Sequence, residues 1–270
     1  MDVQQKPKYR VGKIINSNIS TLSFNETISA IEAWISEKHK QYVCICNTHS
    51  LVTASNDSTF EEVLNQAGLC TPDGMPLVWA LKSYGYAGQE RVDGPNLMLK
   101  LCELSKMKKY KIFLYGGTKD TLAELTQKLL KQYEGIEIVG HHSPPFRKIT
   151  EEEDAEVVKM INSTEADIVF VSLGCPKQEY WMYDHRDRIN GIMIGVGAAF
   201  DFITGSIKRP PLIFQKLGLE WLFRLLKEPK RLWKRYAYNN PVYVYRFLKT
   251  YRKNKKYIVM TKESLERGSF

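Results

Sequence analysis

Short apolar runs recur along the first three quarters of the chain. Four runs carry almost no charge and cover residues 42–47, 111–117, 167–174 and 191–197, and several of them end in glycine. A weaker fifth run covers residues 136–142. Strands that are covered on both faces have this composition, because neither face meets water. We therefore predict that these five runs form the buried strands of one sheet.

Segments with helical periodicity separate the apolar runs. In residues 25–40, Ile28 and Ile31 fall on one helical face together with neighbouring apolar positions. Residues 118–133 and 151–163 begin with threonine or with acidic residues, which helix N-termini favour. Strands that alternate with helices predict an α/β fold, here a Rossmann-like parallel sheet core.

The composition changes near residues 205–211. Residues 206–270 hold 17 Lys and Arg against 4 Asp and Glu, a net charge of +13, whereas residues 1–205 hold 22 against 26, a net charge of −4. We therefore divide the chain into an α/β core, 1–205, and a basic, amphipathic helical appendage, 206–270. Such an asymmetry indicates a polyanionic partner, either nucleic acid or an anionic membrane.

The appendage mixes Leu, Trp, Phe and Tyr with bases and predicts two or three amphipathic helices broken near Pro229 and Pro241. A continuous helix would align Arg224, Arg231 and Arg235, whereas a new helix that begins at Pro229 would disturb this alignment. Bases interleaved with aromatic residues suit a membrane surface, and RNA binding would use the same residues. A helix packed on the core with a solvated basic face is the third interpretation.

Several bulk properties restrict the class of protein. No apolar run approaches the roughly 18 residues of a membrane-spanning helix, and the first residues lack the apolar stretch of a signal peptide. The five cysteines form no CxxC pair, and Cys44 and Cys46 lie in an apolar run as small core residues. These observations predict a cytoplasmic protein.

Parallel sheets bind ligands at the carboxyl ends of their strands, so the residues after each apolar run are candidate contacts. The glycine pair at 116–117 could hold a phosphate on backbone N–H groups, although a plain turn explains it equally well, because its spacing matches neither GxGxxG nor a P-loop. The run 174–179 suits a ribose, base or sugar, or a solvated first helical turn. The candidate ligand contacts are Gly116, Gly117, Gly174, Lys177, Gln178, Glu179, Gly197 and Asp201.

Two charged residues lie in loops outside these runs. Asp73 lies within TPDGMP, where a turn is the simpler interpretation, and Arg91 precedes a Gly-Pro turn. His141 and His142 do not predict a metal site, because adjacent strand residues point to opposite faces. The chain has no Asp-x-Asp, so Arg, Lys or backbone N–H groups would have to balance a leaving diphosphate.

Eight motifs follow one another in a specific order: CNTHS, TPDGMPLVW, ERVDGPNLM, YGGT, LGCPKQEYW, GVGAAFDFITG, KRPP and GLEWLFRLLKEPKRLWKR. In this order the chain, from about Val11 to about Tyr238, resembles the WecG/TagA/CpsF family of glycosyltransferases. The resemblance implies an inverting enzyme that needs neither a metal nor a cofactor. It also implies transfer from a UDP-sugar to a saccharide on undecaprenyl pyrophosphate, in teichoic acid, capsule, exopolysaccharide or common-antigen synthesis.

The resemblance also assigns residues. Asp73 matches the catalytic base, and Asn47, Arg91 and Gln178 match pocket residues. The bases that match a lipid-pyrophosphate site, or lie beside it, are Arg209, Arg224, Arg231, Lys234 and Arg235. Some members have Thr where this chain has Ile45, so the sugar can differ: we expect UDP-N-acetylmannosamine, with UDP-glucose or UDP-N-acetylmannosaminuronic acid as alternatives.

The resemblance places the enzyme on the inner face of the plasma membrane, with the appendage on an anionic surface and no nucleic acid partner, and leaves a homo-oligomer open. Two other classes remain: an RNA-binding α/β protein that uses the basic tail, and a nicotinamide enzyme whose phosphate loop is YGG. The lack of GxGxxG argues against the second.

Overall fold

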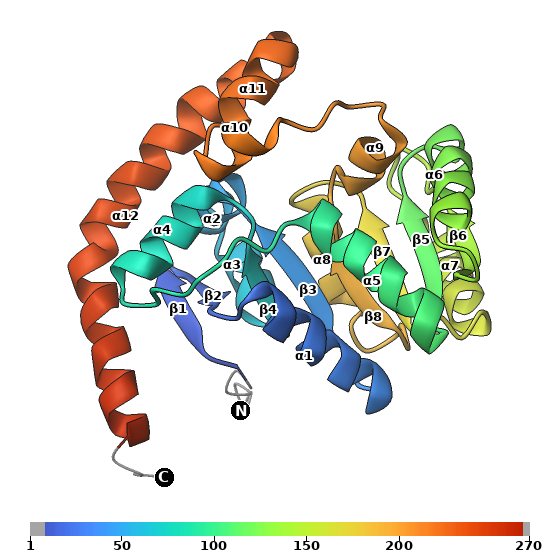
Figure 1. The fold of residues 1–270 in the computed structure, drawn as a ribbon, viewed down its shortest axis with the longest axis horizontal. Helices are drawn as coiled ribbons and strands as arrows, with labels where there is room; N and C mark the ends of the chain where they lie inside the picture. The colour runs from blue at the N-terminus through green and yellow to red at the C-terminus, as the bar shows by residue number, and fades with distance from the viewer. Residues whose placement is uncertain (1–8, 267–270) are drawn as a thin grey trace. The chain divides into compact units, whose positions relative to one another are not determined.

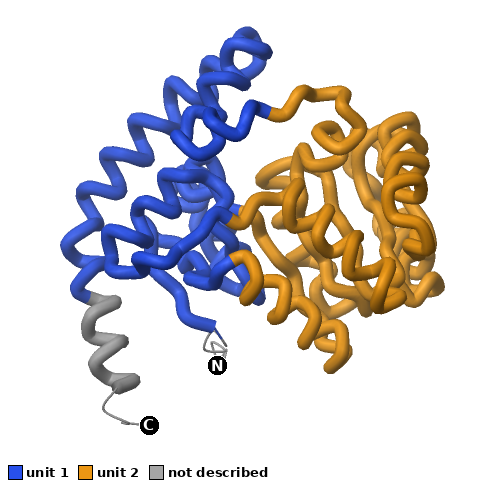
Figure 2. Tube along the Cα trace, in the orientation of Figure 1, with its two compact units in different colours: residues 1–23, 46–91, 210–270 blue, residues 24–45, 92–209 orange. Residues whose placement is uncertain are grey.

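The structure, a computed structural model, describes residues 9–266 and has an α/β fold (Figure 1). The chain divides into two compact units (Figure 2). Unit 1 comprises residues 1–23, 46–91 and 210–270, and unit 2 comprises residues 24–45 and 92–209. The boundary between residues 205 and 206 that the composition suggests stays a prediction.

A parallel sheet forms the centre of the α/β fold, as predicted. The strand order is β4-β3-β8-β7-β5-β6. Its strands are β3 (Tyr42–Cys46), β4 (Leu69–Pro72), β5 (Lys111–Gly116), β6 (Glu137–His142), β7 (Ile168–Ser172) and β8 (Ile192–Gly195). The five strands predicted from apolar runs are confirmed, and β3 and β8 are buried along their whole length because both faces are covered.

The helices of unit 2 pack against this sheet and bury apolar faces such as Leu122, Leu125 and Leu129. They are α1 (Phe24–Ser36), α5 (Gly94–Lys108), α6 (Lys119–Gln132), α7 (Glu151–Ser163), α8 (Lys177–His185) and α9 (Ala199–Thr204). The three helices predicted from periodicity correspond to α1, α6 and α7. Thr118 and Thr150 cap the last two through their hydroxyl groups, as the sequence suggested.

Unit 1 contains a hairpin and two groups of helices that contact each other. The hairpin consists of β1 (Val11–Ile14) and β2 (Ser17–Ser20), which pair antiparallel. The helices are α2 (Thr48–Ala54), α3 (Ser58–Asn65), α4 (Met75–Ser83), α10 (Leu212–Lys216), α11 (Glu220–Lys227) and α12 (Pro229–Glu266). Helix α12 contacts α2 and β1, so the appendage is part of the packing of unit 1.

The appendage has three helices, within the predicted number, but one of the two predicted breaks is wrong. Helix α11 ends before Pro229, whereas α12 continues through Pro241. An internal proline costs a helix about 3 kcal/mol. Burial of Leu232 contributes about 1.5–3 kcal/mol, and tertiary hydrogen bonds from Tyr243 and Asn254 add about 0.5–1.5 kcal/mol each. Packing on both sides of Pro241 therefore offsets a cost of this size.

The interior is apolar and contains free thiols. Cys44, Cys46, Cys70 and Cys102 are buried, as predicted for the first two, and burial raises the pKa of the Cys102 thiol to about 12. In the part of the chain that the structure describes, no helix has both the length and the apolar character that crossing a bilayer requires.

Candidate active site

Asp73 lies in a tight connection between β4 and α4. Strand β4 ends at Pro72, and α4 begins two residues after Asp73 with Pro76 in its first turn. The backbone N–H of Asp73 donates to the carbonyl of Cys46 at 2.9 Å, which fixes the turn against the end of β3. The turn predicted for TPDGMP is therefore present, and it leaves the Asp73 side chain 24 % exposed at a strand end.

Arg91 pairs with this carboxylate. Its Nε and Nη2 both donate to Oδ1 of Asp73, at 3.1 and 2.8 Å, and Nε also donates to the Asp73 carbonyl oxygen. Because both side-chain bonds fall on Oδ1, Oδ2 of Asp73 accepts no hydrogen bond from any residue that the structure describes. One carboxylate oxygen is thus held in place, and the other is available to a ligand.

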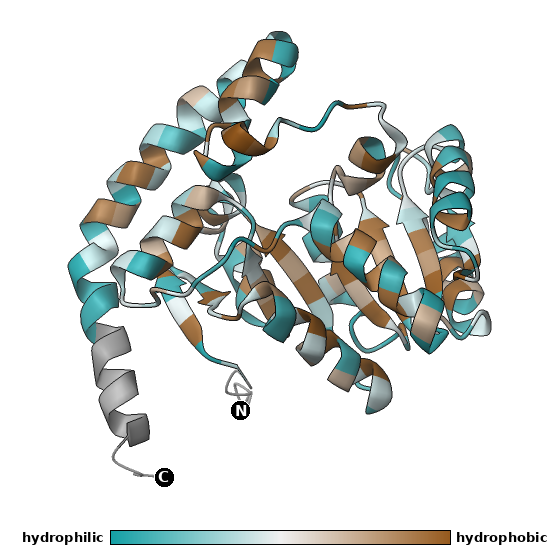
Figure 3. Cartoon of the chain, in the orientation of Figure 1, coloured by the Kyte–Doolittle hydropathy of each residue, from teal (hydrophilic) through white to brown (hydrophobic). Residues whose placement is uncertain are grey.

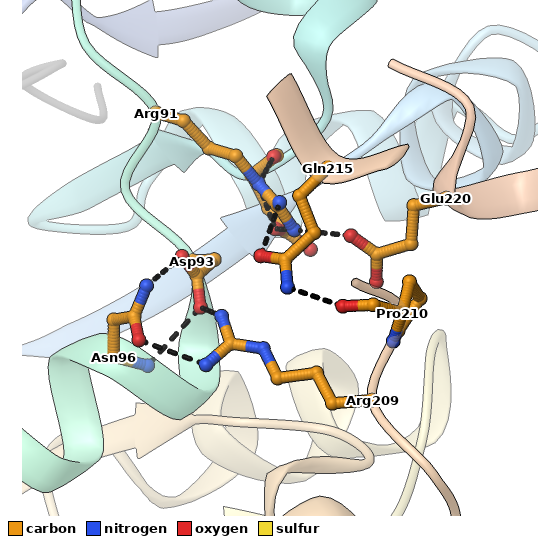
Figure 4. Close-up of polar contacts among 8 residues, drawn as sticks. Arg91, Asp93, Asn96, Arg209, Pro210, Gln215 and Glu220 are labelled. Carbon is orange, nitrogen blue, oxygen red and sulfur yellow. Dashed lines mark hydrogen bonds and ion pairs between the residues drawn. The ribbon is translucent and has the colours of Figure 1, made fainter. Parts of the chain in front are cut away.

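Two residues of the appendage also contact Arg91 (Figure 4). Nη2 donates to Oε2 of Glu220 at 2.8 Å, and Nη1 donates to Oε1 of Gln215 at 3.3 Å. Gln215 in turn donates to the carbonyl of Pro210 at 2.7 Å. Burial raises the pKa of Glu220, and the nearby Asp73 carboxylate raises it further, whereas the Arg91 guanidinium opposes the shift.

Asn47 lies beside the same turn. A Cβ atom at Gly74 would be 3.6 Å from Cβ of Asn47. Oδ1 of Asn47 caps α2 by accepting from the N–H groups of His49 and Ser50, at 3.0 and 3.3 Å. The predicted catalytic residues Asn47, Asp73 and Arg91 are therefore brought together in unit 1, with the oxygen of Asn47 committed to a helix cap.

In unit 2, Gln178 joins two of the glycine-containing strand ends. Its Nε2 donates to Oε1 of Glu179 at 2.9 Å, and its Oε1 accepts from the N–H of Gly197 at 3.1 Å. Its own N–H donates to the carbonyl of Gly174 at 3.0 Å. Gln178 and Glu179 are 3 % and 1 % exposed, so this pair supports the loops from within and does not form a solvated first turn.

Steric constraints explain the two glycines at the end of β5, Gly116 and Gly117. Gly116 has φ +109°, and a Cβ atom there would lie 2.3 Å from the carbonyl oxygen of Ser172 on β7. Gly117 has φ +68° and precedes Thr118, the N-cap of α6. Close approach of two strands and a tight turn therefore require these glycines, whether or not the loop binds a phosphate.

Arg209 forms an ion pair and a hydrogen bond with residues of α5 and the residue that caps it. Its Nη2 donates to Oδ1 of Asp93 at 2.8 Å and its Nη1 to Oδ1 of Asn96 at 2.8 Å, all within unit 2 (Figure 4). Asp93 caps α5 and has a side chain 5 % exposed. This ion pair anchors the segment that follows α9.

The remaining predicted residues have varied surroundings. Lys177 is exposed at the start of α8, and Asp201 is half-buried in α9. Arg224 lies on α11, whereas Arg231, Lys234 and Arg235 lie on α12. The interruption at Glu228 means that these bases do not share one continuous helix, and Arg231 pairs with Glu228 at 2.6 Å.

Glu220, Gln215, Asp93 and Asn96 were not predicted from the sequence. Of these, Glu220, Asp93 and Asn96 lie within motifs quoted above. Among the residues that the structure describes, no group of three His, Cys, Asp or Glu side chains could hold a metal ion. His142 stacks on Tyr115 instead, and burial lowers its pKa.

The fold defines an α/β protein of the Rossmann-like type, and polar residues follow the carboxyl ends of its strands, where such sheets bind ligands. The family model "Glycosyl transferase WecG/TagA/CpsF family" matches residues 12–257. The chain belongs to this family and is a glycosyltransferase.

Similar proteins match almost the whole chain. An N-acetylglucosaminyldiphosphoundecaprenol N-acetyl-beta-D-mannosaminyltransferase of Bacillus spizizenii is 31 % identical over 255 residues, 94 % of this chain and 95 % of the relative. An enzyme of the same name from Staphylococcus aureus is 27 % identical over 259 residues, 95 % of this chain and 99 % of the relative.

Proposed function

We propose that this glycosyltransferase moves N-acetylmannosamine from UDP-N-acetylmannosamine to N-acetylglucosamine on undecaprenyl diphosphate, with inversion at the sugar carbon. The relatives' names supply the sugar and the acceptor. The observation that carries the mechanism is the Asp73–Arg91 pair, in which one carboxylate oxygen is fixed and the other is available. UDP-glucose and UDP-N-acetylmannosaminuronic acid remain the alternative donors.

In this reaction Asp73 acts as the base. The acceptor hydroxyl attacks the anomeric carbon, its proton passes to Oδ2 of Asp73, and the bond between that carbon and the UDP oxygen breaks with its electron pair on UDP. An ionised carboxylate accepts the proton in the transition state, when the hydroxyl has become acidic. Attack on the face opposite the leaving group gives inversion.

Arg91 and backbone groups balance the charge on the departing diphosphate. A guanidinium fork matches phosphate oxygens geometrically, and glycines allow backbone N–H groups to approach them. We assign the donor to the strand-end loops and to the side chains beside them. The assigned residues are Gly116, Gly117, Gly174, Lys177, Gln178, Glu179, Gly197 and Asp201. We propose that no metal is needed.

The appendage serves the lipid acceptor. Hydrophobic and hydrophilic residues alternate along α10, α11 and the first part of α12 (Figure 3), and Leu212, Leu217, Trp221, Leu226 and Trp233 are exposed. Exposed apolar side chains among bases suit a peripheral position on an anionic leaflet, where each base contributes about 1 kcal/mol. We propose a location on the inner face of the plasma membrane, with Arg224, Arg231, Lys234 and Arg235 near the lipid diphosphate.

A donor panel tests this function. UDP-N-acetylmannosamine, UDP-N-acetylmannosaminuronic acid and UDP-glucose are each incubated with a short-chain lipid-diphosphate N-acetylglucosamine, with and without EDTA. We expect transfer from the first donor alone and equal rates in EDTA. Asp73→Asn should lose transfer by about 10²–10⁴-fold while keeping the unfolding curve. Near-normal turnover of Asp73→Asn would refute the base, and loss of activity in EDTA would refute metal independence.

A further inference from the structure

One guanidinium nitrogen serves two carboxylates at the proposed site. Nη2 of Arg91 lies 2.8 Å from Oδ1 of Asp73 and 2.8 Å from Oε2 of Glu220. The side chains of Arg91, Asp73 and Glu220 are 16 %, 24 % and 23 % exposed, so solvent screens their charges only in part. The three groups therefore interact as one electrostatic unit.

The charged groups around Glu220 come from several elements. Asp73 precedes α4, Arg91 precedes α5, Arg224 lies on the same helix one turn further on, and Tyr236 comes from α12. Asp73 and Glu220 thus share the Arg91 guanidinium, and Arg224 lies near Glu220. Burial raises the pKa of the Tyr236 phenol. The sign of each charge matters here because the groups lie partly out of water.

A guanidinium that contacts only Asp73 would make it a poor base. The cation favours the ionised carboxylate and so disfavours protonation of Asp73. A second carboxylate that pairs with the same nitrogen partly neutralises the charge of the guanidinium. It also adds a negative charge near Asp73. Both effects make the arrival of a proton at Asp73 more favourable.

We propose that Glu220 is a positioning residue that holds the Arg91 guanidinium and keeps Asp73 able to accept the proton of the acceptor hydroxyl. The inference rests on the proposed role of Asp73 as the base. It gives the appendage a part in the chemistry beyond lipid binding, because α11 supplies the second carboxylate.

The test compares variants at position 220 across pH. The readout is kcat/KM from pH 4 to 9 with UDP-N-acetylmannosamine and the short-chain lipid-diphosphate acceptor. Glu220→Gln keeps an oxygen for the Arg91 hydrogen bond but removes the charge. We expect the acidic limb of its pH profile to move to lower pH and its plateau to fall about threefold, because removal of the second negative charge makes Asp73 a weaker base.

Two further variants separate charge from packing. Glu220→Asp keeps the charge and should return the acidic limb towards its original position, even if the plateau stays lower. Glu103→Gln removes an exposed carboxylate that pairs with Lys100 on α5 and should change neither the limb nor the plateau. Urea unfolding of each variant checks that the fold is retained.

The possible results distinguish the role of Glu220 from the proposed role of Asp73 as the base. If Asp73→Asn abolishes transfer but Glu220→Gln leaves the acidic limb in place, Glu220 does not act on Asp73 and the base assignment stands. Equal losses in Glu220→Gln and Glu220→Asp without a shift would indicate a packing role and overturn the proposal. Normal turnover of Asp73→Asn would instead remove the base itself.

Discussion

The hydroxyl of Tyr243 on α12 donates a hydrogen bond to the backbone carbonyl of Pro76 at 3.1 Å and thereby ties the C-terminal helix to the first turn of α4. Pro76 lies three residues after Asp73. Tyr243 is 5 % exposed, stacks on Phe247, and has a phenol pKa that burial raises. The turn that carries the candidate base is therefore supported from the appendage.

Tyr243→Phe should destabilise unit 1 by about 0.5–1.5 kcal/mol, because it removes this hydrogen bond and keeps the ring. Urea unfolding measures the difference. Tyr245→Phe is the control on the same helix: its side chain is largely exposed, so we expect a change within about 0.5 kcal/mol. Equal effects of the two variants would show that the Tyr243 bond contributes no net stability.

The glycine at position 116 provides a steric test. Gly116→Ala would place a Cβ atom 2.3 Å from a backbone oxygen of β7 at φ +109°. Gly135→Ala has a similar strain at φ +85° in the same unit, but a Cβ atom there meets only a flexible lysine tip at 3.6 Å.

We expect Gly135→Ala to cost about 1–2 kcal/mol from backbone strain. Gly116→Ala should cost about 3 kcal/mol or more, because overpacking against a neighbouring strand is added to the strain. Thermal unfolding of both variants measures the costs. Similar costs would mean that β5 and β7 move apart to admit the methyl group.

Glu153 should make stability depend on pH in the acidic range. Its carboxylate accepts from Arg147 at 2.7 and 2.5 Å and from the N–H of Thr150 at 2.9 Å, which lowers its pKa to about 2. A carboxyl pKa that is depressed in the fold stabilises above the unfolded value, near 4.5. That contribution disappears as the pH falls towards 2.

The free energy of unfolding of Glu153→Gln should therefore differ from that of the unmodified chain at pH 6. The two values should approach each other at pH 2.5. Chemical unfolding at several pH values measures the two curves. Glu151→Gln, on the first turn of the same helix, controls for the loss of one negative charge near a helix N-terminus. A difference that persists unchanged at pH 2.5 would contradict the assignment.

The central strands could be predicted because burial on both faces makes their composition distinctive. The hairpin β1–β2 could not, because its second strand is Ser-Asn-Ile-Ser and carries little apolar signal. The break predicted at Pro241 failed because local propensity does not include contacts such as the bond from Asn254 to the carbonyl of Ile15. Tertiary packing therefore determines that the helix continues through Pro241.

The candidate site was predictable where one motif contains both the residue and its turn, as for Asp73. It was not predictable where partners are distant in sequence. Glu220 lies 129 positions after Arg91, in a tail whose excess of bases suggests only an anionic partner. The same packing affects experiments: deleting residues after Gly205 would expose the surfaces of α2 and β1 that α12 covers. Point variants therefore test the appendage better than truncation.

Arg209 provides the last prediction, because its ion pair competes with the lipid role that the motif KRPP suggests. Its side chain is 27 % exposed, and it contacts an Asp93 that is 5 % exposed. A double-mutant cycle of Arg209→Gln and Asp93→Asn should give a coupling free energy of about 0.5–3 kcal/mol in urea unfolding, because loss of either charge removes this ion pair and leaves the other charge partly buried.

The pair of Arg231 and Glu228, which is more exposed than the pair of Arg209 and Asp93, is the comparison, with an expected coupling of about 0.2–1 kcal/mol. If Arg209 instead serves the lipid diphosphate, Arg209→Gln should raise KM for the acceptor while its coupling to Asp93 stays near zero. A large coupling with an unchanged KM would assign Arg209 to the anchoring of the segment after α9. It would leave the proposed lipid site to Arg224, Arg231, Lys234 and Arg235.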